Sequence, residues 1–142
     1  MKRALSGGFE LDDDPARVDL DAVWAFLSTE AYWGRERSRE VVERQIAGAA
    51  RVVGLYQEGR QVGFARVVSD GRLAYLADVY VLAGQRGRGL GTELVRAAVD
   101  EGPHRHLRWL LHTMDAHGLY EKFGFGPPSD RVLERPPSDP PG

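Results

Sequence analysis

Segment 73–99 constrains the fold more than any other part of the chain. Its first ten residues, Leu73–Leu82, are apolar, β-branched or aromatic except for Asp78, which is the pattern of a strand largely buried on both faces. Three glycines then stand at alternate positions, and from Thr92 onward apolar residues recur at helical spacing. The segment therefore predicts a strand, a glycine-rich turn and a helix, in that order.

The glycine-rich turn has the composition of an anion site. Glycines leave the backbone N–H groups unshielded, and a helix N-terminus adds about half a positive charge. Two arginines within the turn contribute formal charge. We expect a phosphate group to bind here; the alternative is a tight turn with two solvated arginines. The residues expected to hold the phosphate are Arg86, Gly87, Arg88, Gly89, Leu90, Gly91 and Thr92.

The spacing of the turn distinguishes among phosphate-binding patterns. The Walker pattern needs Gly-Lys-Ser/Thr, and no lysine lies near the turn. The Rossmann pattern needs a third glycine where this chain has Thr92. The pattern Gln/Arg-x-x-Gly-x-Gly does match residues 86–91. In this respect the chain resembles the GCN5-related N-acetyltransferases (GNAT family), whose members bind a pyrophosphate at this loop.

A second segment strengthens the resemblance. Residues 107–112 read as a strand, followed by a short helix over 116–123 and then Gly124-Phe125. The letters Ala-x-x-Leu-Tyr-Glu-Lys-x-Gly-Phe at 116–125 look like the second motif of the family. The resemblance extends over residues 52–125.

Length and composition set the broad class. A chain of 142 residues suits one domain, expected over 1–135, with a disordered Pro-rich tail over 136–142. The net charge of −2, with both signs interspersed, argues against nucleic-acid binding. There is no cysteine, no apolar run long enough to span a membrane and no visible secretory signal. We therefore expect a cytoplasmic protein that binds no membrane.

The remaining elements complete the order β-α-α-β-β-β-α-β-α, with a possible final strand. This order rests partly on the periodicity of the sequence and partly on the resemblance. The predicted fold is an α/β GNAT fold, with a mixed central sheet flanked by helices. Its expected elements are strands at 9–11, 51–56, 61–69 and 131–133, a helix from Asp19, a second helix after Ser38, and a hairpin turn over 57–60.

The resemblance also implies a reaction. Acetyl-coenzyme A (acetyl-CoA) would be the donor and a primary amine the acceptor, with direct attack of the neutral amine on the thioester. The pantetheine arm would pair with the backbone of Val79, Tyr80 and Val81, and the N–H of Val79 would stabilise the oxyanion. Tyr120 matches the family's general acid, with the alternative that it is a core aromatic residue.

The general base is left open by the sequence. Several family members carry Glu early in the central strand, where this chain has Tyr75. Asp78 is the only carboxylate of that strand, but alternation places it on the face opposite Val79 and Val81. It is either the base or a carboxylate satisfied by arginine or backbone donors. Glu30 and a water chain are the other candidates.

Thr113 and the histidines are also ambiguous. Thr113 stands where the family often has an Asn that touches the cofactor, and Asp115 could substitute for it, but each is also a good helix N-cap. The four histidines do not have the spacing of a zinc site, and the reaction needs no metal, so none is expected.

The acceptor is expected to meet the connection between the first two helices. There Glu30 could attract an ammonium group, and Tyr32 and Trp33 could form an aromatic wall; the alternative is a packed helix end and a solvated basic loop. We expect a small-molecule acceptor, and a homodimer partner could complete the site. Two other functions remain: a non-catalytic acetyl-CoA-sensing or partner-binding module of the same fold, and an unrelated nucleotide-binding domain.

Overall fold

The computed structural model of the protein describes residues 1–31 and 36–138. Within these ranges six strands form one open sheet, and their spatial order follows their order in the chain. Neighbouring strands are antiparallel except for the last pair, which is parallel. The strands are β1 (Lys2–Ala4), β2 (Phe9–Asp12), β3 (Arg51–Gln57), β4 (Arg60–Ser69), β5 (Leu73–Val81) and β6 (Arg108–Leu110).

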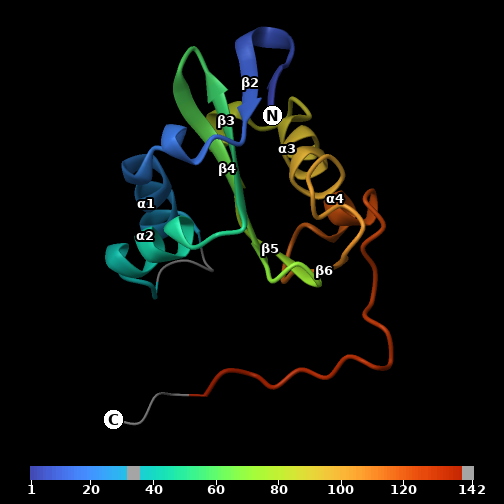
Figure 1. Ribbon diagram of the computed structural model, residues 1–142. Coiled ribbons are helices and arrows are strands. Elements are labelled where there is room, and N and C mark those ends of the chain that lie inside the picture. Colours follow the sequence, from blue (N-terminus) through green and yellow to red (C-terminus); the bar gives the residue numbers. More distant parts are fainter. Residues whose placement is uncertain (32–35, 139–142) are drawn as a thin grey trace.

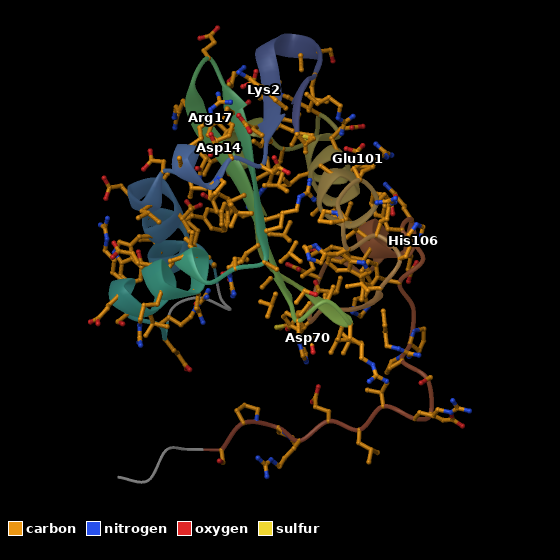
Figure 2. The ribbon with its side chains drawn as sticks, in the orientation of Figure 1. Lys2, Asp14, Arg17, Asp70, Glu101 and His106 are labelled. Carbon is orange, nitrogen blue, oxygen red and sulfur yellow. The ribbon has the colours of Figure 1, made fainter. Side chains whose placement is uncertain are left out.

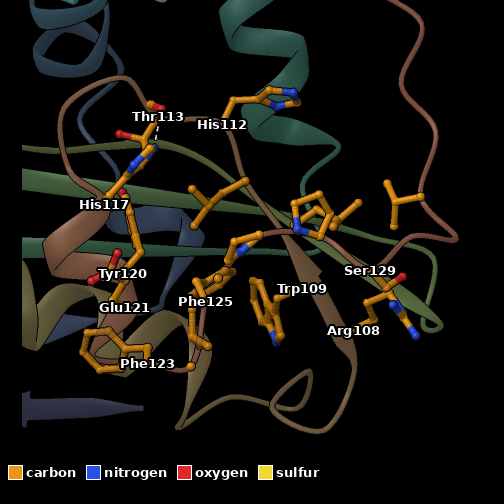
Figure 3. Close-up of a pocket in the computed structure, with 18 of the residues that line it drawn as sticks. Arg108, Trp109, His112, Thr113, His117, Tyr120, Glu121, Phe123, Phe125 and Ser129 are labelled. Carbon is orange, nitrogen blue, oxygen red and sulfur yellow. Dashed lines mark hydrogen bonds between the residues drawn. The ribbon is translucent and has the colours of Figure 1, made fainter.

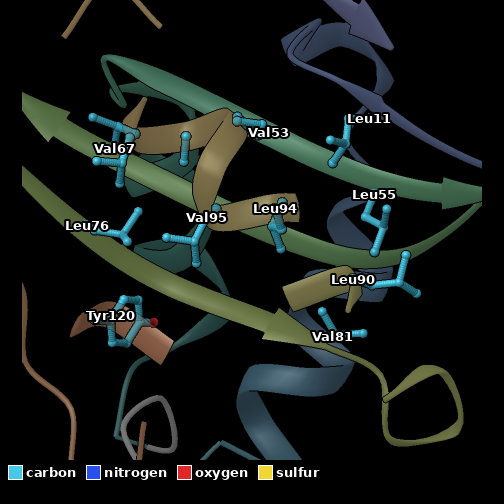
Figure 4. Packing of buried hydrophobic residues seen from close by; sticks show 14 of the residues in the cluster. Leu11, Val53, Leu55, Val67, Leu76, Val81, Leu90, Leu94, Val95 and Tyr120 are labelled. Carbon is cyan, nitrogen blue, oxygen red and sulfur yellow. The ribbon is translucent and has the colours of Figure 1, made fainter. Parts of the chain in front are cut away.

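Helices cover both faces of the sheet, as predicted (Figure 1). On one face α1 (Leu20–Thr29) and α2 (Arg39–Ala47) enclose a core that includes Phe26 and Phe64. On the other, α3 (Leu90–Val99) and α4 (His117–Glu121) lie over the larger core (Figure 4). Short 3-10 turns occupy Ser6–Gly8, Pro15–Arg17 and Ala83–Gln85.

Local sequence signals explain the helix starts and the hairpin. The Asp19 side chain accepts a hydrogen bond from the amide of Ala22 at 3.1 Å and caps α1. The hydroxyl of Ser38 accepts one from the amide of Val41 at 3.2 Å and caps α2. Between β3 and β4, Glu58 and Gly59 have φ of +51° and +81°, as a two-residue hairpin turn requires. These three predictions are confirmed.

A β-bulge interrupts β5 next to the site. Phe64 of β4 pairs with Tyr80 and Arg66 pairs with Ala77, so β5 carries one extra residue, and Asp78 has a φ of +56°. As a result Asp78 turns toward the α1/α2 face. Val79 and Val81 pack on the α3/α4 side, which confirms the predicted opposition of Asp78 to these valines.

Strands β5 and β6 separate soon after they meet. Their pairing covers only Leu73–Tyr75, and beyond Tyr75 the described chain places no strand against this edge of β5. The amide of Leu82 donates to Val62 of β4 at 2.8 Å. Because backbone groups alternate along a strand, the N–H and C=O of Val79 and Val81 point toward the open edge.

The structure departs from the predicted elements at both ends of the chain. Strand β1 was not predicted, and the strand expected at 131–133 does not form. The amide of Val132 instead donates to the carbonyl of Ser129 in a turn, and Leu133 is 94% exposed. Prolines at 127, 128, 136 and 137 remove backbone donors from this segment, which disfavours pairing. Strand β6 and helix α4 are also shorter than predicted.

Candidate active site

Backbone amides at the start of α3 form a concentrated group of donors. Gly89 is the N-cap, with φ of +75°, and no side chain caps the helix there. The amide of Glu93 bonds to the carbonyl of Gly89, and that of Arg86 to Ala83. Between these two, the amides of residues 87–92 have no hydrogen-bond acceptor in the part of the chain that the structure describes. The predicted anion site therefore begins at Gly87, because the amide of Arg86 is already paired.

Packing does not explain the glycines of this loop. A Cβ at Gly87 or Gly89 would meet no described atom within 4 Å, and at Gly91 it would only reach Leu119 at 4.0 Å. Positive φ accounts for the first two, whereas Gly91 lies in the first turn of α3 without one. A bare backbone at Gly91 suits the close approach of a ligand. The loop thus fits a diphosphate group.

The loop adjoins the open edge of β5. The Nε atom of Arg86 donates to the carbonyl of Val81 at 3.0 Å, which links loop and edge directly. The open edge of β5 at Val79 and Val81 is where the pantetheine arm is predicted to bind, and we call it the pantetheine slot. Tyr80 does not fit its predicted place in this slot. Its backbone groups face β4 by alternation, and its ring stacks on Phe26 with centroids 4.0 Å apart.

Tyr120 lies beside a cleft of about 820 Å³ between β6, α4 and the C-terminal segment (Figure 3). The residue is 9% exposed, and its ring meets Phe125 edge to face at 5.9 Å. It is the fourth of the five residues of α4, and its side chain therefore does not lie in the first positions of that helix. The structure therefore shows the packing role, and the acid role stays a prediction.

A family model identifies what these features have in common. The model of the acetyltransferase (GNAT) family matches residues 20–125, which include the loop, β5 and α4. The chain belongs to the GNAT family.

Individual relatives agree with this assignment. A crystal structure of a Xanthomonas campestris protein assigned to the GNAT family is 37% identical, with a TM-score of 0.83 over 89% of this chain and 92% of the other. A Gibberella zeae protein named as a candidate acetyltransferase is 28% identical over 82% of this chain and 77% of its own length. A Clostridium acetobutylicum structure described as containing acetyl-CoA shares the fold at 16% identity and a TM-score of 0.62, over 90% and 96% of the two chains.

The side chain of Asp78 forms ion pairs with two arginines in this GNAT domain. Its side chain is 4% exposed and accepts hydrogen bonds from Arg37 at 2.7 and 3.1 Å and from Arg66 at 2.8 Å. Burial alone would raise the pKa of Asp78, but the hydrogen bonds and charges of the two arginines outweigh it and lower the pKa. The alternative of a carboxylate satisfied by arginine is confirmed, and the geometry does not support Asp78 as the general base.

We expect Asp78→Asn to lower the free energy of unfolding by about 3–5 kcal/mol, because two largely buried guanidinium groups lose their counter-charge. Chemical denaturation measures this change. Because the folded pKa is lowered, the wild type should lose this contribution as the pH falls below the ordinary value of 3.8, and the variant should lack that dependence. Asp21→Asn is the control, since Asp21 is 83% exposed and its loss should cost under about 1 kcal/mol. Equal stability of the two variants would contradict the prediction.

Of the other predicted residues, the structure describes Thr113 and Glu30. The hydroxyl of Thr113 accepts a hydrogen bond from the amide of Ala116 at 3.1 Å, which favours its role as a cap before α4. Glu30 is exposed at the end of α1. Tyr32 and Trp33 lie outside the described residues. Within the described ranges no three His, Cys, Asp or Glu side chains gather as for a metal, and no helix is long and apolar enough to cross a membrane.

Proposed function

We propose that this protein transfers the acetyl group of acetyl-CoA to a primary amine of a small molecule. The observation that carries the proposal is the row of amides at 87–92 beside the open edge of β5. Membership of the GNAT family supports acetyl-CoA as the donor, and the related fold solved with acetyl-CoA agrees with it.

The residues of this chain have distinct tasks in the proposed reaction. The amides of the loop bind the diphosphate with charge-assisted hydrogen bonds, supported by the exposed Arg88. Val79 and Val81 offer backbone groups along the slot, and Arg86 must release the Val81 carbonyl if the pantetheine arm is to use it. The N–H of Val79 stabilises the developing oxyanion, a task worth about 3 kcal/mol for such a donor. Tyr120 supplies the proton that the departing sulfur needs.

Thiol release from acetyl-CoA, measured with and without each member of a panel of amines, tests the proposal. The panel contains aminoglycosides, polyamines, amino acids, aromatic amines and a lysine peptide. We expect release to depend on a small amine and an acetylated amine to appear by mass spectrometry. Preference for the lysine peptide would contradict the small-molecule acceptor. Tight binding of acetyl-CoA with no turnover on any amine would contradict the enzyme and favour the acetyl-CoA-sensing module.

A further inference from the structure

Three polar side chains form a continuous chain at the end of the sheet where β5 and β6 part. The hydroxyl of Tyr75 is hydrogen-bonded to Nδ1 of His112, and Nε2 of His112 lies 3.0 Å from a carboxylate oxygen of Glu134. They come from β5, from the residues after β6 and from the C-terminal segment. Tyr75 is partly buried, whereas the side chains of His112 and Glu134 are 71% and 66% exposed. Neither GNAT motif in the sequence contains any of the three.

The chemistry of the three groups fixes the direction of these hydrogen bonds. A carboxylate can only accept, so Nε2 of His112 must donate to Glu134. In the neutral imidazole Nδ1 then carries the lone pair and accepts from the Tyr75 hydroxyl. The oxygen of Tyr75 keeps lone pairs that can accept a proton from a third group. A carboxylate behind an imidazole orients proton relays in the same way.

Tyr75 lies on β5, the strand whose open edge is the proposed slot for the thioester. Tyr75 is the last residue of β5 paired with β6, and Val79, whose N–H faces the slot, follows four residues later. Tyr75 lies opposite Val68 of β4, on the α1/α2 face. Val68 and Leu73 are 44% and 41% exposed, so this end of the face is open to an acceptor. Tyr120 lies in the core beneath α3, on the other face.

We propose that Tyr75, His112 and Glu134 accept the proton of the acceptor amine. This inference rests on the proposed function. The ammonium group passes one proton to the Tyr75 oxygen while the Tyr75 proton moves to His112, and the exposed imidazolium beside Glu134 releases it to solvent. As the neutral amine forms the C–N bond and the C–S bond breaks, sulfur takes a proton from Tyr120. The second proton of the amine nitrogen, carried through solvent, restores Tyr120.

The three residues Tyr75, His112 and Glu134, which we call the relay, are surrounded by a few identifiable charged groups. Arg66 of β4 and Asp78 of β5 are close enough to act on Tyr75, and both belong to the ion-pair cluster with Arg37. Burial raises the pKa of Tyr75, so its hydroxyl stays protonated at neutral pH until the relay acts. Glu134 is the carboxylate that faces His112.

The ¹⁵N chemical shifts of the His112 ring test the arrangement without any acceptor. We expect the neutral His112 ring of the wild-type protein to show a protonated Nε2 and an unprotonated Nδ1. In Glu134→Gln the amide no longer enforces this tautomer, so the two forms should mix. A wild-type ring protonated at Nδ1 would overturn the proposal.

The pH dependence of kcat/KM, measured with the fastest amine of the panel, tests whether the relay accepts the proton of the amine. We expect His112→Gln and Tyr75→Phe each to lower kcat/KM about 10²-fold near neutral pH, with recovery at high pH, where the amine is already unprotonated. The control is His106→Gln, an exposed histidine on the α3/α4 side of the molecule (Figure 2), which should leave the profile unchanged.

Two further readouts separate the relay from folding and from the proposed function. Acetyl-CoA affinity and melting temperature should stay at wild-type values in Tyr75→Phe and His112→Gln. If either fails to fold, Glu134→Gln on the exposed segment should still lower kcat/KM near neutral pH, because the carboxylate no longer holds the His112 ring in the tautomer that accepts from Tyr75. Normal wild-type turnover with unchanged profiles in these variants would refute the relay alone. Absence of wild-type turnover on every amine would refute the proposed function and the relay with it.

Discussion

Gly89→Val should weaken acetyl-CoA binding by about 10²–10⁴-fold, as measured by isothermal titration calorimetry. Valine does not tolerate the φ of +75° at this position, so the loop must change its path. At least two amides would then turn away from the diphosphate, and hydrogen bonds to charged groups are worth about 1.5–3 kcal/mol each. Arg88→Ala should weaken binding much less, because the side chain adds charge without shaping the loop.

Gly59→Val separates this effect from general backbone strain. Gly59 also has a positive φ, +81°, and a Cβ there would meet no described atom within 4 Å. Both variants should lose about 1–3 kcal/mol of stability from the strained backbone. Only Gly89→Val should lose affinity. If Gly59→Val binds acetyl-CoA as poorly as Gly89→Val, the amides at the start of α3 are not the diphosphate site.

Tyr120→Phe should lower kcat about 10²-fold while acetyl-CoA binding and stability stay near wild type. Phenylalanine keeps the ring that packs against Phe125 and removes only the hydroxyl that would protonate the sulfur. Steady-state kinetics with calorimetry for the affinity measure both quantities.

Tyr56→Phe is the matched control for Tyr120→Phe. Tyr56 is a buried tyrosine of β3, and its hydroxyl has no hydrogen-bond partner among the described residues, so removing it should cost little stability. It should also leave kcat unchanged. If Tyr120→Phe turns over at the wild-type rate, Tyr120 serves only as a core residue.

Local sequence patterns predicted those parts of the fold that local chemistry determines. The helix start near Asp19, the cap at Ser38, the Gly59 hairpin and the loop–helix unit at 86–99 each depend on residues within a few positions of one another. Strand β1 carries no such pattern, since Lys2-Arg3-Ala4 holds its place only by pairing with β2.

Contacts between distant residues were beyond the reach of these patterns. The partners of Asp78 stand 41 and 12 residues away, at Arg37 and Arg66, so sequence could offer only the alternative that some arginine satisfies it. Arg51 likewise donates to the carbonyl of Ala97 at 2.7 Å and caps the C-terminus of α3 across 46 residues. The pairing of Tyr75 with His112 spans 37 residues.

The agreement between strand order and chain order has a consequence for how the molecule is held together. Strands β1 to β5 are joined by antiparallel pairs, whereas β6 joins β5 in a parallel pair that requires the crossover containing α3. This parallel pair involves only residues 73–75 of β5, so β6 is held to the sheet over a short length. A ligand bound in the gap between β5 and β6 would therefore fasten the segment from α3 onward to the antiparallel part of the sheet.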